Sequence, residues 1–207
     1  MRLNLGCSDN LLGGWLNVDI ARPDPLTVEN FQQADLALPW PWADSSVDEI
    51  YAADIFEHIG DCDHMGQNCL HCWPRGAADQ VNPHELRHWS GRIHVMNESW
   101  RVLKPGGRLT MICPDAAKGA GQWQDPTHVT PWTPNGLQYF ADGSPAHKRF
   151  AAAYGITARF KVLGATENKY EEWAGSPARI LADDPPETRV YCEVWKFTAV
   201  LEAVKDV

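Results

Sequence analysis

The sequence has no apolar run that approaches the length of a membrane-spanning helix, and it has no excess of positive charge. The first absence predicts no membrane span, since a span needs about 20 consecutive apolar residues. Lys and Arg number 18 against 27 Asp and Glu, giving a formal net charge of −9. A protein that grips a nucleic-acid backbone needs a basic face. Broad nucleic-acid binding is therefore not expected, and a small molecule is the better candidate partner.

A secretory signal and the fingerprint Gly-x-Gly-x-x-Gly are also missing. Met1 and Arg2 lead directly into a strand-like segment, and the missing fingerprint argues against NAD. Six cysteines without a signal indicate a reducing compartment, so we expect a cytoplasmic protein. With 207 residues, 44% of them hydrophobic, the chain is expected to form a single domain over 1–207. Nothing in the sequence indicates the oligomeric state.

Residues 3–19, LNLGCSDNLLGGWLNVD, carry the strongest functional pattern in the chain. An apolar strand runs into the small-residue turn Gly6, Cys7 and Ser8, and a second strand ends on Asp19. Glycine allows the backbone to approach a ligand closely, because it has no Cβ. An acid at the tip of the next strand can accept hydrogen bonds from a ribose diol, as in open α/β sheets that bind nucleosides. The alternative is an ordinary strand-turn-strand with a solvated aspartate.

The rest of the chain predicts a mixed α/β sheet. Residues 21–34 are expected to be irregular, because Pro23 and Pro25 exclude a regular helix. Residues 116–158 are expected to be rich in loops, with one short helix, and 174–188 to form a surface loop. Apolar patterning predicts strands at 3–5, 15–20, 47–55, 108–113, 159–164 and 189–200, and helices beginning at 56 and covering 93–103 and 135–140.

Residues 60–91 interrupt this order with three cysteines, four histidines and no clear apolar period. We interpret the segment as an insertion. The spacing of Cys69 and Cys72 suits one Zn²⁺, and a structural zinc would order a loop that has no apolar face. The alternative is a loop with incidental thiols. The expected ligands are Cys62, Cys69, Cys72 and His64, with His71, His84 or His88 as the other choices for the fourth position.

Three segments in order resemble a small class I S-adenosylmethionine-dependent methyltransferase of the type 11 kind. They are LNLGCS…NVD, ADLALPWPWADSSVDEIYAADIFEHI and MNESWRVLKPGGRLTMICPD. The resemblance covers about 1–115, which would be the cofactor-binding core, and leaves 116–207 as the part that closes the sheet and faces the acceptor. It implies a Rossmann-like open sheet of about seven strands, mostly parallel with the last antiparallel. Helices would flank the sheet, and the insertion would follow the fourth strand.

The resemblance also implies the residues that contact the cofactor. Gly6, Cys7 and Ser8 would approach its methionyl part, Asp19 its ribose, Asp35 and Leu36 its adenine, and Asp54 would face the site of methyl transfer. The chain departs from the family pattern in two ways. Ser8 replaces the usual second glycine, and no helix precedes the first strand. We therefore expect the insertion to serve as the lid over the cofactor.

The expected activity is methyl transfer to a small-molecule acceptor, with a sugar or a cell-surface precursor as candidates. Methyl transfer depends on in-line positioning, and a general base is needed only when the acceptor carries a proton. His128, Asp115 and His58 are the candidate bases, and each could instead be a packing or turn residue. The motif Asp/Asn-Pro-Pro-Tyr/Trp is absent after the fourth strand, which argues against amino methylation of a DNA base.

Two other functions fit the same residues. One is a non-catalytic binding or scaffold protein that keeps the fold and uses a zinc-stabilised loop for interaction. The other is an aminopropyl-type transferase with a related cofactor, which would need more acids around the acceptor than the sequence places there.

Overall fold

The computed structural model describes residues 1–21, 30–60, 90–119, 121–173 and 191–206. The predicted zinc ligands Cys62, His64, Cys69 and Cys72 and the predicted lid lie outside these residues, as does the surface loop at 174–188. Among the described residues, no helix is both long and apolar enough to cross a membrane.

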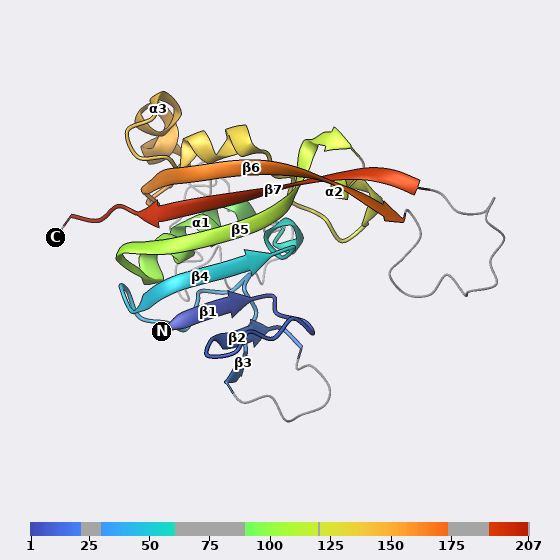
Figure 1. The fold of residues 1–207 in the computed structure, drawn as a ribbon. Helices are drawn as coiled ribbons and strands as arrows, with labels where there is room; N and C mark the ends of the chain where they lie inside the picture. The colour runs from blue at the N-terminus through green and yellow to red at the C-terminus, as the bar shows by residue number, and fades with distance from the viewer. Residues whose placement is uncertain (22–29, 61–89, 120, 174–190, 207) are drawn as a thin grey trace, which may run out of the picture.

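Seven strands form one sheet in the order β3-β2-β1-β4-β5-β7-β6 (Figure 1). Strands β1 to β5 pair in parallel, whereas β7 lies between β5 and β6 and runs antiparallel to both. The predicted fold class is confirmed. The strands are β1 Arg2–Leu5, β2 Leu16–Asp19, β3 Phe31–Gln33, β4 Val47–Ala53, β5 Leu103–Gly119, β6 Phe160–Trp173 and β7 Tyr191–Ala203.

Alternation along the central strands builds the core of the sheet. Leu109, Met111 and Cys113 of β5 are fully buried, and in the antiparallel register they stand beside Leu201, Ala199 and Phe197 of β7. Side chains two positions apart point to the same face of a strand. Each of these pairs therefore contributes to one apolar layer.

The helix α1, Gly91–Val102, lies behind the sheet in Figure 1. Its apolar spacing predicted this helix correctly, and Met96 is fully buried. The predicted stop at Lys104 falls slightly late, because the helix ends at Val102 and Leu103 already pairs with Val47 as the first residue of β5.

Three predictions of local structure were incomplete. The irregular segment contains β3, whose Phe31 to Gln33 pair with β2; these residues are partly or fully exposed and so carry no apolar alternation. The helix expected from residue 56 is a single 3-10 turn, η1 Phe56–His58, within the described residues. The loop-rich stretch holds η2 Pro134–Tyr139, close to the expected short helix, together with α2 Gly121–Gln124 and α3 Pro145–Tyr154.

The helix α3 was missed although its signals are present. Ser144 caps its start by accepting a hydrogen bond from the His147 backbone N–H at 3.0 Å. Pro145 occupies the first turn, and Gly155 ends the helix with a φ of 69°. This is the usual order of serine, proline and terminal glycine in helices.

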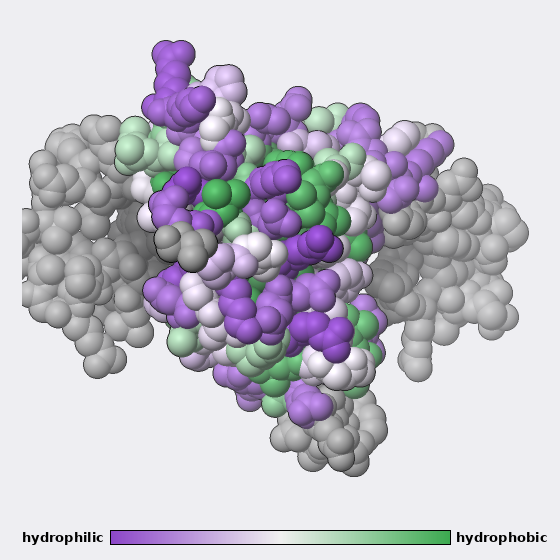
Figure 2. Space-filling view, turned by 60° about the vertical axis from the view of Figure 1, so that its left-hand side comes forward, coloured by the Kyte–Doolittle hydropathy of each residue, from purple (hydrophilic) through white to green (hydrophobic). Residues whose placement is uncertain are grey.

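Both termini lie on the same side of the sheet in Figure 1, at the amino ends of the parallel strands. Figure 2 turns that side toward the viewer and shows hydrophilic residues mixed with small hydrophobic areas. The carboxyl ends of β1, β2 and β4 point the other way, and the predicted cofactor residues lie there.

Candidate functional site

The turn after β1 is shaped by Gly6. Its φ is +63°, and a Cβ placed there would lie 2.5 Å from the Ile55 side chain. Glycine is therefore required for the left-handed backbone and for close packing against the segment that follows β4. The Cys7 backbone N–H donates to the Val18 carbonyl at 3.0 Å, which joins the turn to β2.

Cys7 itself presents a buried thiol, with 1% of the residue exposed. Burial, followed by the nearby Asp19 carboxylate, raises the pKa of this thiol to about 11. Cys7 is therefore a neutral packing residue at physiological pH, and its side chain is unsuited to act as a nucleophile. Any contact with a cofactor would come from its backbone.

Asp19 is oriented by two backbone amides. Its Oδ2 accepts a hydrogen bond from the Ser8 N–H at 2.9 Å, and its Oδ1 accepts one from the Ala21 N–H at 3.2 Å. The turn after β1 and the acidic end of β2 are thus brought into direct contact. A carboxylate has about four acceptor positions, so two remain for hydroxyl donors.

A buried amide pair that the sequence analysis missed holds these two strands in place. Asn4 Nδ2 donates to Asn17 Oδ1 at 2.8 Å, and the same oxygen accepts from the Leu12 N–H at 2.9 Å. Asn4 Nδ2 also donates to the Asn10 carbonyl at 2.7 Å. Both side chains are almost fully buried, so the loop between β1 and β2 is anchored from within. The signal was two asparagines within strand-like segments, a position where this residue is depleted.

The segment after β3 contains the predicted adenine contacts. Asp35 Oδ1 accepts a hydrogen bond from the Ala37 N–H at 2.9 Å. Leu36 is only 4% exposed and belongs to the core, while its carbonyl accepts a hydrogen bond from Trp40 Nε1 at 3.1 Å. The Leu36 side chain therefore supports the loop, and Asp35 and Leu38 are the more accessible residues.

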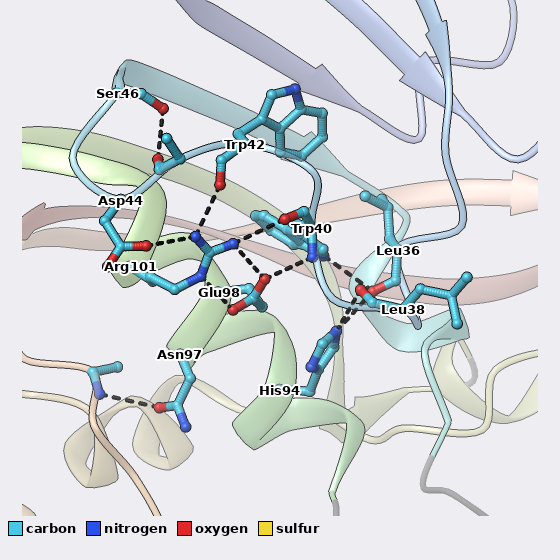
Figure 3. Close-up of polar contacts among 12 residues, drawn as sticks. Leu36, Leu38, Trp40, Trp42, Asp44, Ser46, His94, Asn97, Glu98 and Arg101 are labelled. Atoms are coloured by element: carbon cyan, nitrogen blue, oxygen red, sulfur yellow. Dashed lines mark hydrogen bonds and ion pairs between the residues drawn. The ribbon is translucent and has the colours of Figure 1, made fainter. Parts of the chain in front are cut away.

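Helix α1 fixes this segment through charged side chains (Figure 3). Arg101 donates to the carbonyls of Trp40 and Trp42 at 3.0 and 2.8 Å, and it forms an ion pair with Glu98 at 2.7 Å. Glu98 in turn accepts a hydrogen bond from the Trp40 N–H at 2.7 Å. His94 Nε2 lies 3.1 Å from the Leu36 carbonyl oxygen. These contacts connect the loop after β3 to the helix behind the sheet.

Asp54 follows β4 in a left-handed conformation, with a φ of 51°. Its carboxylate is exposed and forms an ion pair with Lys196 of β7 at 3.0 Å. Aspartate tolerates this region better than most residues, and such conformations are concentrated at functional sites. Its backbone N–H donates to the Ile112 carbonyl at 2.9 Å, which holds this residue beside β5.

Asp115, one of the predicted bases, is 1% exposed. Its Oδ1 accepts a hydrogen bond from the Ala117 N–H at 3.0 Å, and its backbone bridges to Trp132. The side chain therefore closes a local turn in β5, which is the structural role that the sequence left open for it.

The other two predicted bases lie together. The rings of His58 and His128 meet edge to face with their centroids 4.7 Å apart. His58 comes from η1 and His128 from the loop after α2. Burial and the neighbouring His128 lower the pKa of His58.

Glu57 lies beside these histidines and was not predicted as a site residue. It is fully buried, and neither carboxylate oxygen has a hydrogen-bond partner among the described residues. Burial, with a smaller contribution from Asp54, raises the pKa of this carboxyl to about 8. The available signal was a glutamate directly before a histidine in the first turn after β4.

A separate cavity of about 540 Å³ lies between α1, η2 and α3. Its lining includes Ile93, Tyr139 and Tyr154, with Arg92 as its charged member and Trp132 at its inner wall. Trp132 packs at 6.1 Å between ring centroids against Phe56, the residue before Glu57. The volume and aromatic lining are typical of small-molecule sites.

No protein-family model matches the chain, and no curated protein matches it in sequence. Solved structures do match in fold. A proposed methyltransferase from Bacillus halodurans has a TM-score of 0.55 at 10% identity, and the YcgJ protein from Bacillus subtilis has 0.53 at 13%. A S-adenosylmethionine-dependent methyltransferase from Methanosarcina mazei has 0.52 at 12%. Each match covers 99% of this chain and 92% of the other. The chain therefore has the fold of the class I S-adenosylmethionine-dependent methyltransferases.

Proposed function

We propose that this chain binds S-adenosylmethionine at the carboxyl ends of β1 to β4 and transfers its methyl group to a small-molecule acceptor such as a sugar. The observation that carries the proposal is the hydrogen bond from the Ser8 N–H to Asp19. It joins the glycine turn to the acidic strand end, on a fold that binds nucleosides at this edge.

The side chains at this edge suit an adenosine group. Asp19 keeps acceptor positions for the ribose hydroxyls, and charge-assisted hydrogen bonds of this kind are strong. Leu11, Ile20 and Leu38 follow β1, β2 and β3, and they are 40%, 63% and 39% exposed. Exposed apolar side chains beside an oriented carboxylate fit a ligand with one flat apolar face and one polar edge.

When bound, S-adenosylmethionine supplies a methyl carbon that the acceptor's lone pair attacks in line, while the carbon–sulfur bond breaks and its electron pair goes to sulfur. The protein's part is to hold the two reactants in line. Asp54 stands at the end of β4, and His58 and His128 follow on the expected acceptor side. One of these histidines would take the acceptor's proton where it carries one. The aromatic cavity behind Trp132 has the size for a small-molecule acceptor.

Calorimetric titration with S-adenosylhomocysteine tests the proposal. Asp19→Asn keeps the size of the side chain and removes its charge. It should weaken binding about tenfold or more, since a charge-assisted hydrogen bond contributes roughly 1.5–3 kcal/mol. Asp9→Asn is the matched control, because Asp9 is an exposed carboxylate of the same loop, and it should bind as the unsubstituted protein does.

Failure of the unsubstituted protein to bind either S-adenosylmethionine or S-adenosylhomocysteine would overturn the proposal. A second result would be that the protein binds S-adenosylmethionine and yet forms no S-adenosylhomocysteine with any of a panel of hydroxyl, amine and carboxylate acceptors. That result would favour the non-catalytic alternative. Thermal denaturation of both variants separates a lost contact from a lost fold.

A further inference from the structure

The feature that remains unexplained is the buried Glu57 carboxylate. It is 0% exposed, and neither oxygen has a partner at regular hydrogen-bond geometry among the described residues. Burial raises its pKa, and the backbone N–H of Glu57 and the neighbouring Cys113 thiol, a weak donor, offset this effect only in part. An unpaired carboxylate in such a place is costly, so buried carboxylates are normally paired, protonated or bound to a metal. Its backbone carbonyl, by contrast, accepts a hydrogen bond from the Thr130 N–H at 2.9 Å.

His58 is held in one tautomer by its neighbours. Thr127 Oγ1 donates to Asp125 Oδ1 at 2.6 Å, because a carboxylate can only accept. The same hydroxyl oxygen lies 3.0 Å from His58 Nδ1 and must then accept from it. Nδ1 of His58 therefore carries the proton, and Nε2 keeps its lone pair.

His128 is held in the same way. Its Nδ1 lies 3.0 Å from the Gly121 carbonyl oxygen, which can only accept, so Nδ1 carries the proton. Its Nε2 lies 3.8 Å from Asp125 Oδ2, beyond hydrogen-bond distance. A histidine whose Nδ1–H is fixed by a carbonyl or another oxygen is the usual arrangement for a metal ligand that binds through Nε2.

The three side chains offer ligand atoms that all lie within 4.8 Å of one another. In tetrahedral coordination, atoms that share one ion at ~2.1 Å lie ~3.4 Å apart, so side-chain adjustments of up to about 1.5 Å would complete the set. We propose that Glu57, His58 and His128 bind one divalent transition-metal ion. Two imidazole nitrogens and one carboxylate suit Zn²⁺, Mn²⁺ or Co²⁺.

The ligands of this ion would differ from those of the zinc expected at Cys62, Cys69 and Cys72. Three protein ligands leave coordination positions for water or a substrate oxygen. An Nε2 that binds metal cannot also take a proton, so in the metal-bound protein neither His58 nor His128 would serve as the general base proposed above. The metal proposal does not depend on methyl transfer.

Titration of the full chain with Co²⁺ tests the proposal, with visible absorption as the signal of the coordination sphere. The background protein carries Cys62→Ser, Cys69→Ser and Cys72→Ser, which removes the other expected site, and has no polyhistidine tag. After treatment with a chelator it should bind one equivalent of Co²⁺. The spectrum should lack the thiolate charge-transfer band in the near ultraviolet.

Glu57→Gln, His58→Gln and His128→Gln in this background should each weaken binding by at least about a hundredfold, since loss of even an outer-shell partner costs 10–100-fold. Thr127→Val removes the acceptor for His58 Nδ1–H and the hydroxyl donor to Asp125, but leaves all three ligands in place. It should weaken binding about tenfold. His147→Gln is the control, because His147 lies on α3 with its ring nitrogen beside the Ala158 carbonyl, and it should change nothing.

Substoichiometric Co²⁺ binding in the background with the three serine substitutions would overturn the proposal. So would a Co²⁺ affinity of Glu57→Gln or His128→Gln that equals the affinity of that background. Glu57→Gln is nearly isosteric, and it replaces a carboxyl that burial keeps largely protonated in the metal-free protein at neutral pH. It is therefore expected to fold, and thermal denaturation in the absence of metal checks this. Binding of S-adenosylhomocysteine is measured on the same samples, so failure of the metal site is distinguishable from failure of the proposed function.

Discussion

At the scale of single residues, the candidate site depends on positions where a left-handed backbone restricts which residue can be accommodated. Gly6 has a left-handed backbone and Ile55 against the place of its missing Cβ. Asp54 is left-handed as well, although it carries a side chain. These positions fix where the turn after β1 and the end of β4 stand relative to each other.

Gly6→Ala is expected to lower the free energy of unfolding by more than the conformational cost alone. An alanine at positive φ costs about 1 kcal/mol. At Gly6 the clash with Ile55 at 2.5 Å adds to it. Gly143→Ala is the control, because Gly143 also has a positive φ, of +76°, but open space around its Cβ position. Urea denaturation measures both, and an equal loss in the two variants would contradict the role assigned to Ile55.

The sequence predicted Gly6 and Asp19 as cofactor contacts because their local spacing is informative, and the structure brings the turn at Gly6 into contact with Asp19. The sequence did not identify Asn17 or Glu57 as important, because their roles arise from burial and from partners far along the chain. The contact between His58 and His128 likewise joins residues about 70 positions apart. Such contacts follow from the assembled sheet, and no local pattern encodes them.

At the scale of elements, α1 connects the sheet to the loop after β3. The sequence predicted its apolar face, but it did not predict the contacts made by its polar face. Glu98 and Arg101 look like an ordinary surface pair until the loop carbonyls of Trp40 and Trp42 are placed against them. The short edge strand β3 was missed because tertiary contacts outweigh its weak local pattern, whereas α3 was missed although its capping signals stand in the sequence.

Glu98→Gln is expected to destabilise the protein most at neutral pH. Burial would raise the pKa of Glu98, but hydrogen bonds from Arg101 and the Trp40 N–H outweigh it, and the pKa is lowered from 4.5. The ionised form thus stabilises the fold above pH 4.5, and this contribution is lost as the pH falls through the folded-state pKa. The expected loss at neutral pH is about 1–3 kcal/mol.

Urea denaturation at neutral pH and at several values below 4.5 measures this effect. The difference between Glu98→Gln and the unsubstituted protein should shrink toward low pH. Glu202→Gln, on β7, controls for the loss of one negative charge. A difference that does not change with pH would contradict the ionic contribution.

At the scale of the whole molecule, a net charge of −9 accompanies a sheet edge that carries Asp19, Asp35 and Asp54. A negative potential raises the local concentration of cations and is screened by salt. S-adenosylmethionine carries a sulfonium charge that S-adenosylhomocysteine lacks. Under the proposed function, the protein should therefore favour S-adenosylmethionine electrostatically over S-adenosylhomocysteine.

Rising ionic strength is accordingly expected to weaken binding of S-adenosylmethionine more than binding of S-adenosylhomocysteine. Between low salt and about 0.5 M, the ratio of the two dissociation constants should shift severalfold, because the Debye length falls below ~10 Å. Calorimetry over a salt series measures the ratio. A ratio that stays constant would show that the sheet-edge charges do not reach the ligand.

The place of β7 in the sheet has a consequence for synthesis on the ribosome. β6 emerges from the ribosome before β7, but in the folded sheet it is β7 that lies next to β5. Until then β5 offers an open edge, and β6 could occupy it in a wrong, parallel pairing. Chains grow at about 5–20 residues per second, so this interval lasts on the order of seconds. The edge of β5 must therefore stay unpaired while β6 is already available. The sheet is completed only when β7, which is synthesised after β6, inserts between β5 and β6.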